Sequence, residues 1–228
     1  MNKFELTSEF VTNVFGVKLF RICALVKFGD VKAGELGGYI ETEENLNQDD
    51  DAWVYGNAKV YGNAKVSGDA KVSGNAWVYG NAEVSGNAEV SGNAEVSGNA
   101  WVSDDAKVSG NAKVSGDAKV SGNAKVSGDA QVSGYAWVSD DAWVSGNAKV
   151  YGNAKVSGDA DYATVKGFGR LNRDTTFFRC KDGKIRVVCG CFFGDLEEFR
   201  AIVKRTHGDG KLAKEYLSIA DLMEMHFE

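Results

Sequence analysis

The residues that most often carry catalytic or metal chemistry are few in this chain and lie near its C-terminal end. The two histidines are His207 and His226, and three of the four cysteines are Cys180, Cys189 and Cys191. A zinc site with three histidine ligands cannot be built from two histidines, and no C-x-x-C spacing marks the cysteines as ligands. Free cysteine is among the most buried residue types. We therefore expect reduced, packed thiols, with a metal site as the alternative, and we predict no catalytic residue and no cofactor.

A cluster of positive charge is the second candidate for chemistry. Residues 166–186 carry seven lysines and arginines against two aspartates. The Asp-Gly pair at 182–183 is typical of a two-residue hairpin turn between strands 176–181 and 184–192. Such a hairpin sets arginine opposite arginine and lysine opposite lysine, namely Arg179 with Arg186 and Lys181 with Lys184. It also places the three cysteines on one apolar face with Phe178, Ile185 and Val187.

Like charges that face each other across a hairpin destabilise it, so this arrangement suggests a missing counter-charge. Arginine forks fit phosphate well. We predict an anion or ligand site formed by Arg170, Arg173, Arg179, Lys181, Lys184 and Arg186. The alternative is neutralisation by acidic residues from elsewhere, such as Glu197 or Glu198.

The chain before these groups is dominated by a repeat. Residues 52–160 repeat every six residues without one insertion, with eighteen valines in strict phase. Six is not a multiple of 3.6, whereas Ala-x-Val is the alternation of a short strand, and Gly-Asn or Gly-Asp supplies the left-handed backbone of a corner. Three strands close a coil of eighteen residues. The sequence therefore predicts six coils, a rod of roughly 29 Å, with valines stacked on valines.

Stacking every eighteenth residue also maps the surface of the predicted rod. One corner ladder alternates carboxylate with amide over most of its length, and an intervening asparagine can donate to both neighbours. This ladder runs through Asp69, Asn87, Asp105, Asn123, Asp141 and Asp159. We interpret it as ordinary corner chemistry, with a calcium ladder as the alternative.

All five tryptophans occupy the outward position of a predicted strand, where the core of valine and alanine cannot cover them. They are Trp53, Trp77, Trp101, Trp137 and Trp143. We expect them to be buried against the terminal segments or against a second copy in a trimer. Aromatic binding sites are the alternative, and the densest patch consists of Tyr61, Trp77 and Tyr79.

The tandem hexads resemble the left-handed parallel β-helix of hexapeptide-repeat proteins over about half the chain. The flanking segments look like a phage and prophage hexapeptide-repeat family of unassigned role; they read FGDVK (28–32), GELGGYIE (34–41), TTFF (175–178) and CGCF (189–192). The resemblance implies a homotrimer and a viral or mobile-element context, but no chemistry. Many hexapeptide-repeat enzymes are acyltransferases with a histidine base on an inserted loop. Residues 52–160 contain neither a histidine nor an insertion.

The predicted fold class is mainly β, in three parts. Residues 1–51 form an N-terminal cap and an irregular first coil, because Ile40 and Leu46 are six apart but two residues out of phase with Val54. Residues 52–160 form the β-helix. Residues 161–228 form a small domain of one hairpin and two helices. The first helix starts in a capping box at 195–198 and stops at Gly208, and the second covers 211–227. Their order is hairpin, helix, helix.

Composition restricts the partners. A net charge of −6 argues against general nucleic-acid binding, and no apolar run reaches the ~20 residues of a membrane helix. We expect a location in the cytoplasm, that of the host cell if a phage encodes the protein. We predict a non-enzymatic, phage-type binding or scaffold protein that sequesters a phosphate-bearing small molecule or a host protein. The alternative is a hexapeptide-repeat acyl- or nucleotide-sugar transferase with a site between subunits.

Overall fold

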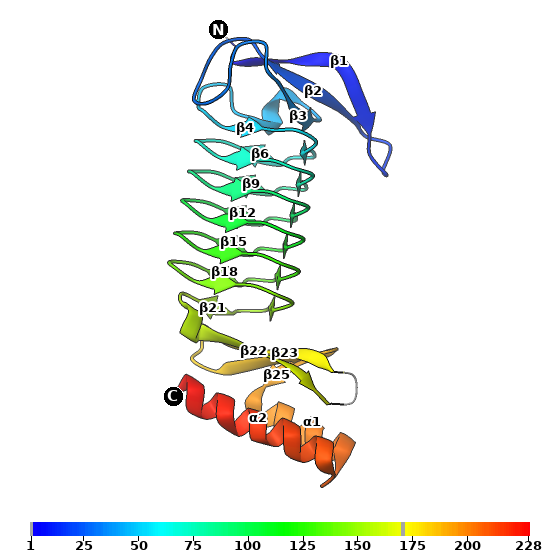
Figure 1. Cartoon of the computed structure of the whole chain (residues 1–228), viewed down its shortest axis with the longest axis vertical. Coiled ribbons are helices and arrows are strands. Elements are labelled where there is room, and N and C mark those ends of the chain that lie inside the picture. Colours follow the sequence, from blue (N-terminus) through cyan, green and yellow to red (C-terminus); the bar gives the residue numbers. More distant parts are fainter. Residues whose placement is uncertain (1, 170–171) are drawn as a thin grey trace.

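The computed structural model describes residues 2–169 and 172–228, apart from the side chain of Arg173. The chain forms an elongated rod with the two termini at opposite ends (Figure 1). Eighteen two-residue strands build the rod, and they stack as three parallel ladders of six. The predicted parallel β-helix, with six regular coils, is therefore confirmed.

The rod strands are β4 (Trp53–Val54), β5 (Lys59–Val60), β6 (Lys65–Val66), β7 (Lys71–Val72), β8 (Trp77–Val78), β9 (Glu83–Val84), β10 (Glu89–Val90), β11 (Glu95–Val96), β12 (Trp101–Val102), β13 (Lys107–Val108), β14 (Lys113–Val114), β15 (Lys119–Val120), β16 (Lys125–Val126), β17 (Gln131–Val132), β18 (Trp137–Val138), β19 (Trp143–Val144), β20 (Lys149–Val150) and β21 (Lys155–Val156).

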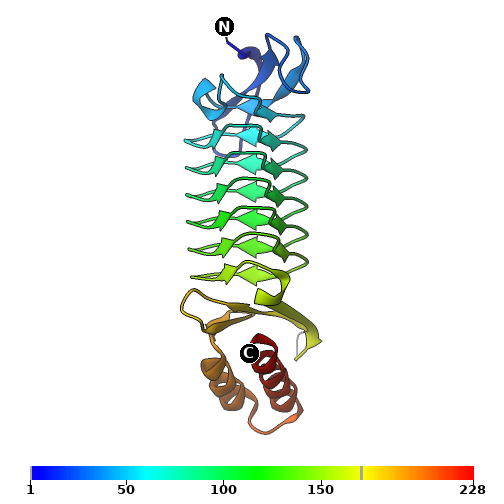
Figure 2. The same cartoon turned by 90° about the vertical axis from the view of Figure 1, so that its left-hand side faces the viewer.

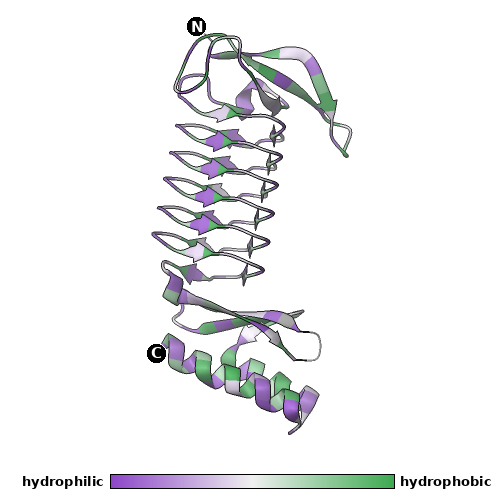
Figure 3. Ribbon diagram, in the orientation of Figure 1, coloured by the Kyte–Doolittle hydropathy of each residue, from purple (hydrophilic) through white to green (hydrophobic). Residues whose placement is uncertain are grey.

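Each hexad forms a two-residue strand followed by a corner, as expected. The valines and alanines of the repeat are fully buried, and each valine pairs with the valine eighteen residues away, as Val90 pairs with Val108. Figure 3 shows this alternation: many of the short strands carry a hydrophilic residue next to a hydrophobic one. The corner needs glycine at positions such as Gly98, whose φ is +70° and whose added Cβ would lie 2.9 Å from the backbone nitrogen of Gly116.

The corner ladder also forms. Asn87 donates to Asp105 over 2.9 Å, and Asn123 donates to Asp141 over 3.0 Å. Each of these amides thus donates to the carboxylate of the following coil. The other two corners carry similar chains of asparagine, which end on Asp117 and Asp129.

The N-terminal cap consists of β1 (Phe4–Thr12), β2 (Lys18–Ala24) and β3 (Leu36–Ile40), followed by a short 3-10 turn over Glu43–Asn45. β1 and β2 form a hairpin that extends the sheet of β3 and β5. Ile40 pairs with Val60 and Leu46 with Val66, twenty residues away instead of eighteen. The irregular first coil that the phase shift predicts is therefore confirmed.

The C-terminal part contains more β-strands than the sequence predicts. A four-stranded antiparallel sheet is formed by β22 (Tyr162–Phe168), β23 (Arg173–Arg179), β24 (Ile185–Cys189) and β25 (Phe192–Asp195), after a 3-10 turn over Asp159–Asp161. The helices are α1 (Leu196–His207) and α2 (Lys211–Phe227), as predicted, and Asp195 caps α1 through Glu198. The sheet lies between the end of the rod and the two helices (Figures 1 and 2).

The predicted hairpin is β23–β24, but its register is off by one residue. Phe177 pairs with Val187, and Arg179 pairs with Ile185. The turn contains three residues, because the Cys180 nitrogen donates to the Lys184 oxygen and Gly183 adopts a φ of +76°. A three-residue loop with a left-handed glycine at its end is the second common way to close a hairpin. Since side chains alternate between faces, this shift changes which residues face each other.

Within the residues that the structure describes, no helix is long and apolar enough to cross a membrane.

Candidate ligand-binding groove at the end of the rod

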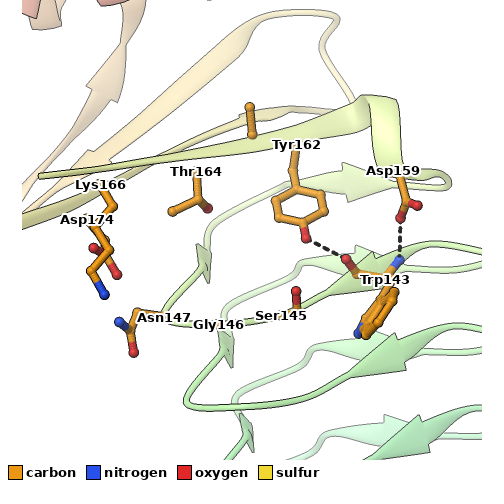
Figure 4. A pocket seen from close by; sticks show the side chains of 10 residues that line it. Trp143, Ser145, Gly146, Asn147, Asp159, Tyr162, Thr164, Lys166 and Asp174 are labelled. Atoms are coloured by element: carbon orange, nitrogen blue, oxygen red, sulfur yellow. Dashed lines mark hydrogen bonds between the residues drawn. The ribbon is translucent and has the colours of Figure 1, made fainter.

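A groove of about 410 Å³ lies where the last coils of the rod meet the C-terminal sheet. Its volume is within the range of small-molecule sites. One wall comes from the rod and the other from β22 and β23 (Figure 4). The lining side chains are those of Trp143, Ser145, Asn147, Asp159, Tyr162, Thr164, Lys166 and Asp174. The groove thus combines one aromatic face with hydroxyl, amide and charged groups.

Trp143 is held in place by three hydrogen bonds from three segments. Its backbone nitrogen donates to Asp159 Oδ1 over 2.9 Å, and its backbone oxygen accepts from the Tyr162 hydroxyl over 2.5 Å. The indole nitrogen donates to Ser127 Oγ over 3.0 Å. The side chain nevertheless stays 52% exposed. The hydrogen bond to Ser127 therefore orients the indole, and Trp143 lines the groove while half of the residue stays exposed.

The far end of the groove is polar. Lys166 and Asp174 lie there together, and Thr164 lies between them and the tyrosine (Figure 4). Lys166 is exposed, and Asp174 is partly buried. Because a planar aromatic surface lies at one end and an ammonium group at the other, the groove suits a ligand with one flat and one anionic or hydroxylated end.

The structure does not bring the predicted anion-binding residues together. Arg179 and Ile185 share the face toward the helices, whereas Arg186 shares the face toward the rod with Phe178. The predicted pairing of Arg179 with Arg186 is therefore wrong, because the three-residue turn moves the register by one. Anion binding by these residues itself stays a prediction.

Most of these cations have partners of their own. Arg179 lies 3.4 Å from Asp161 and donates to the Phe227 oxygen over 2.6 Å. Arg186 donates to Asp182 over 2.8 Å, and Lys184 lies 3.9 Å from Asp195. Lys181 lies over the ring of Trp137, with its Nζ 5.8 Å from the centroid. Arg173 belongs to β23, and Arg170 lies outside the described residues. Acidic residues therefore do neutralise several of these cations, but they are aspartates and not Glu197 or Glu198.

Cys180, Cys189 and Cys191 are free thiols in three different environments. The prediction that they share one apolar face is wrong, because the register of the hairpin differs by one residue from the predicted one. Cys180 is buried with the rod core, and burial raises its pKa to about 11. Cys189 packs on the side of the helices and accepts from the Thr175 hydroxyl over 3.2 Å, and Cys191 is exposed. No group of three or more metal-binding side chains occurs within 2–169 and 172–228.

The predicted aromatic patch does assemble, and the N-terminal cap covers part of it. Tyr61 stacks on Tyr79 with ring centroids 5.1 Å apart, and its centroid lies 6.3 Å from that of Trp77. Leu19 and Tyr39 of the N-terminal cap pack over the patch. Burial raises the pKa of Tyr61 to about 12. Tyr61 therefore belongs to the core of the cap, whereas Trp77 and Tyr79 are only partly buried.

The five tryptophans divide into two groups. Trp53 is fully buried against Phe4 and Phe28, which confirms burial against a terminal segment, and Trp77 is partly buried under the cap. The other three, Trp101, Trp137 and Trp143, are 42%, 39% and 52% exposed.

Sequence reasoning missed the groove because its two walls are separated along the chain. The outward position of Trp143 near the end of the repeat was a usable signal. Tyr162 and Thr164 gave none, since β22 was not predicted. Searches of protein-family models and of curated proteins find no match to this chain.

Proposed function

We propose that this protein is a non-enzymatic binding or scaffold rod that holds a phosphate-bearing small molecule in the groove at its C-terminal end. The observation that supports this proposal most directly is the state of Trp143, which is fixed by three hydrogen bonds and still half exposed. A rigid aromatic surface loses little conformational entropy when a ligand stacks on it. Such preorganisation favours binding, although two of the three bonds also satisfy backbone groups of β19, the edge strand of its ladder.

The chemistry of the groove favours a nucleotide-like ligand. A flat base stacks on the indole of Trp143, while a phosphate approaches Lys166 at the other end. The carboxylate of Asp159 already accepts from the Trp143 nitrogen. Asp174 beside Lys166 lowers the local positive charge, which favours a ligand with few phosphate groups over a polyphosphate.

The test is a titration of the full chain with AMP, UMP and cyclic di-AMP, measured by calorimetry and by the shift in melting temperature. Binding of at least one of them is expected, and it should weaken by at least about tenfold in Trp143→Ala. Lys166→Ala should weaken it too and reduce its dependence on salt. Lys113→Ala, an exposed lysine on the rod outside this groove, is the matched control and should bind as the wild type does.

Two results would overturn the proposal. One is equal affinity in the wild type and in both groove variants. The other is turnover of acyl-coenzyme A or nucleotide-sugar donors, which would favour the alternative of a transferase with a site between subunits. A binding protein shifts its melting temperature with the ligand and consumes nothing.

The proposal extends to the setting and the assembly of the protein. The resemblance of the flanking segments to a phage and prophage family supports action in the host cytoplasm, where a ligand or a host protein would be sequestered. A mass-spectrometric inventory of what co-purifies with the chain from a bacterial host would identify it.

We also propose a homotrimer, because a slender core of valine and alanine leaves little surplus over the entropy of ordering each coil. Sedimentation equilibrium should then give about three times 24.4 kDa. A monomer at micromolar concentration would contradict the trimer and leave the groove proposal intact, since both walls of the groove belong to one chain.

A further inference from the structure

A seven-residue segment occurs twice in the rod. Residues 100–106 and 136–142 both read Ala-Trp-Val-Ser-Asp-Asp-Ala. They lie thirty-six residues apart, which is two coils, so both fall on the same face and at the same corner. Trp101 pairs with Lys119, and Lys119 pairs with Trp137. Two tryptophans therefore stand in one ladder with a lysine between them.

The corner after each of these tryptophans departs from the repeat. Asp104 has a φ of +58° and Asp140 a φ of +54°, at a position where the other hexads of the rod have glycine. Left-handed backbone is unfavourable for a residue with a Cβ. Asp104 Oδ2 accepts from the Gly122 nitrogen over 3.0 Å, and Asp140 Oδ2 accepts from the Ser139 hydroxyl over 3.1 Å. Glycine corners turn the chain equally well without a carboxylate, so the fold does not require these two aspartates.

A groove of about 350 Å³ lies between the two indoles. Its floor and sides are polar, with the hydroxyls of three serines, one carboxylate and one ammonium group. These residues are Ser85, Ser103, Ser121, Asp104 and Lys119. The groove thus has two apolar faces separated by hydrogen-bonding groups of both kinds.

Both rings are fixed in the same way. The indole nitrogen of Trp101 donates to Ser85 Oγ over 3.3 Å, and that of Trp137 donates to Ser121 Oγ over 3.2 Å. Lys119 Nζ lies 5.2 Å from the ring centroid of Trp101. Because the strands of a parallel ladder are ~4.8 Å apart, the rings repeat at roughly 10 Å along the rod. A ligand that uses both rings must therefore be an extended chain.

We propose that this groove binds a neutral oligosaccharide. The C–H faces of pyranose rings pack on aromatic side chains, and sugar hydroxyls both donate and accept, which matches a wall of serine, aspartate and lysine. The site lies on another face of the rod than the groove at Trp143 and takes a different ligand, so either proposal can fail alone.

Charge argues against a nucleic acid as the occupant. Single-stranded nucleic acids also stack on aromatic side chains, but they need a positively charged groove for their backbone. Here each tryptophan is followed by two adjacent carboxylates, Asp104 with Asp105 and Asp140 with Asp141. These four carboxylates outweigh the two lysines over the rings, Lys119 and Lys181. A neutral chain is not repelled by these carboxylates.

The experiment is a calorimetric and tryptophan-fluorescence titration of the full chain with maltohexaose, cellohexaose, chitohexaose and, for comparison, an oligothymidylate. At least one saccharide is expected to bind, and the Trp101→Ala/Trp137→Ala double variant is expected to lose this binding. Asp104→Gly restores the usual corner of the repeat, so it should fold with an unchanged or higher melting temperature and bind at least about tenfold more weakly. Lys107→Ala, which lies on another face, should bind as the wild type does.

Several outcomes would overturn the proposal. They are the absence of binding by all three saccharides at millimolar concentration, unchanged saccharide binding in the double variant, or binding of the oligothymidylate instead. Protection of Trp101 and Trp137 from iodide without any sugar would assign this face to a second copy of the chain and would overturn it as well.

Discussion

Val108→Asp is expected to lower the free energy of unfolding by more than about 4 kcal/mol. Val108 is fully buried and stacks between Val90 and Val126 in the inner ladder. A carboxylate at this position would be surrounded by valine and alanine and would find no donor within the coil. Urea denaturation or a thermal melt should show the loss, and because each coil rests on its neighbours, we expect it across the whole rod rather than in one coil.

The matched control is Lys113→Ala, one hexad further along the chain. Lys113 points outward and forms an exposed ion pair with Glu95 at 3.1 Å. Pairs of this kind contribute little, so the variant should change the free energy of unfolding by no more than ~0.5 kcal/mol. An unchanged melting temperature in Val108→Asp would contradict the inward orientation of the valines and with it the register of every coil.

The rod could be predicted in detail because its determinants are local and repeat without interruption. The alternation of Ala58, Lys59 and Val60 sets which side chain points inward, and the following Gly62 sets the corner. The period of eighteen then fixes every ladder, including the pairing of Glu89 with Lys107. Even the irregular first coil was visible, because Ile40 and Leu46 keep the spacing of the repeat while they leave its phase.

The contacts that close the first coil were not visible, because they depend on single polar side chains far apart in the sequence. Asn45 is buried and donates to the backbone oxygens of Gly62 and Ala64 over 2.9 Å in each case. Gln48 accepts from the backbone nitrogen of Lys3 over 2.8 Å. Neither contact leaves a periodic pattern in the sequence, so neither can be found from spacing alone.

In the C-terminal sheet, an error of one residue in the predicted turn changes which side chains share a face. Asp182-Gly183 closes hairpins of two or of three residues, and here Gly183 is the last residue of a three-residue loop. The one-residue difference moves Arg186 to the face of the rod and leaves Arg179 on the face of the helices. The predicted pairing of Arg179 with Arg186 and of Lys181 with Lys184 was lost for this reason. The hairpin itself was located, but the predicted strand 184–192 is divided into β24 and the start of β25.

The candidate groove at Trp143 was beyond prediction for a different reason. Trp143 and Tyr162 belong to different parts of the fold, and their contact depends on where the C-terminal sheet docks. Docking is set by Phe178 and Cys180, which pack on the last valines of the rod, and by a bridge between Ala154 and Cys180. The paired tryptophans at 101 and 137, in contrast, follow from the period alone.

Trp53→Ala is expected to destabilise the protein by about 3–5 kcal/mol, the usual range for a large aromatic side chain removed from a core. Trp53 holds the N-terminal cap on the rod, since it is fully buried and packs edge-on against Phe4 and Phe28 at centroid distances of 6.2 and 5.3 Å. Beside it, Lys3 Nζ lies 4.9 Å from the centroid of Phe28 and donates to the Ala52 oxygen over 2.9 Å. The variant should therefore loosen the whole cap and leave an open end on the β-helix.

Two control variants distinguish the packing of Trp53 against the cap from the effect of its outward position in the repeat. Trp143 occupies the other end of the same outward ladder and is half exposed, so Trp143→Ala should cost no more than about 1 kcal/mol. Trp53 Nε1 is buried and, among the described residues, has no hydrogen-bond partner, so Trp53→Phe loses volume but no hydrogen bond and should cost far less than Trp53→Ala. Equal melting temperatures for Trp53→Ala and Trp143→Ala would show that the cap does not rest on Trp53, and hydrogen exchange of the β1–β2 hairpin in Trp53→Ala would then remain as slow as in the wild type.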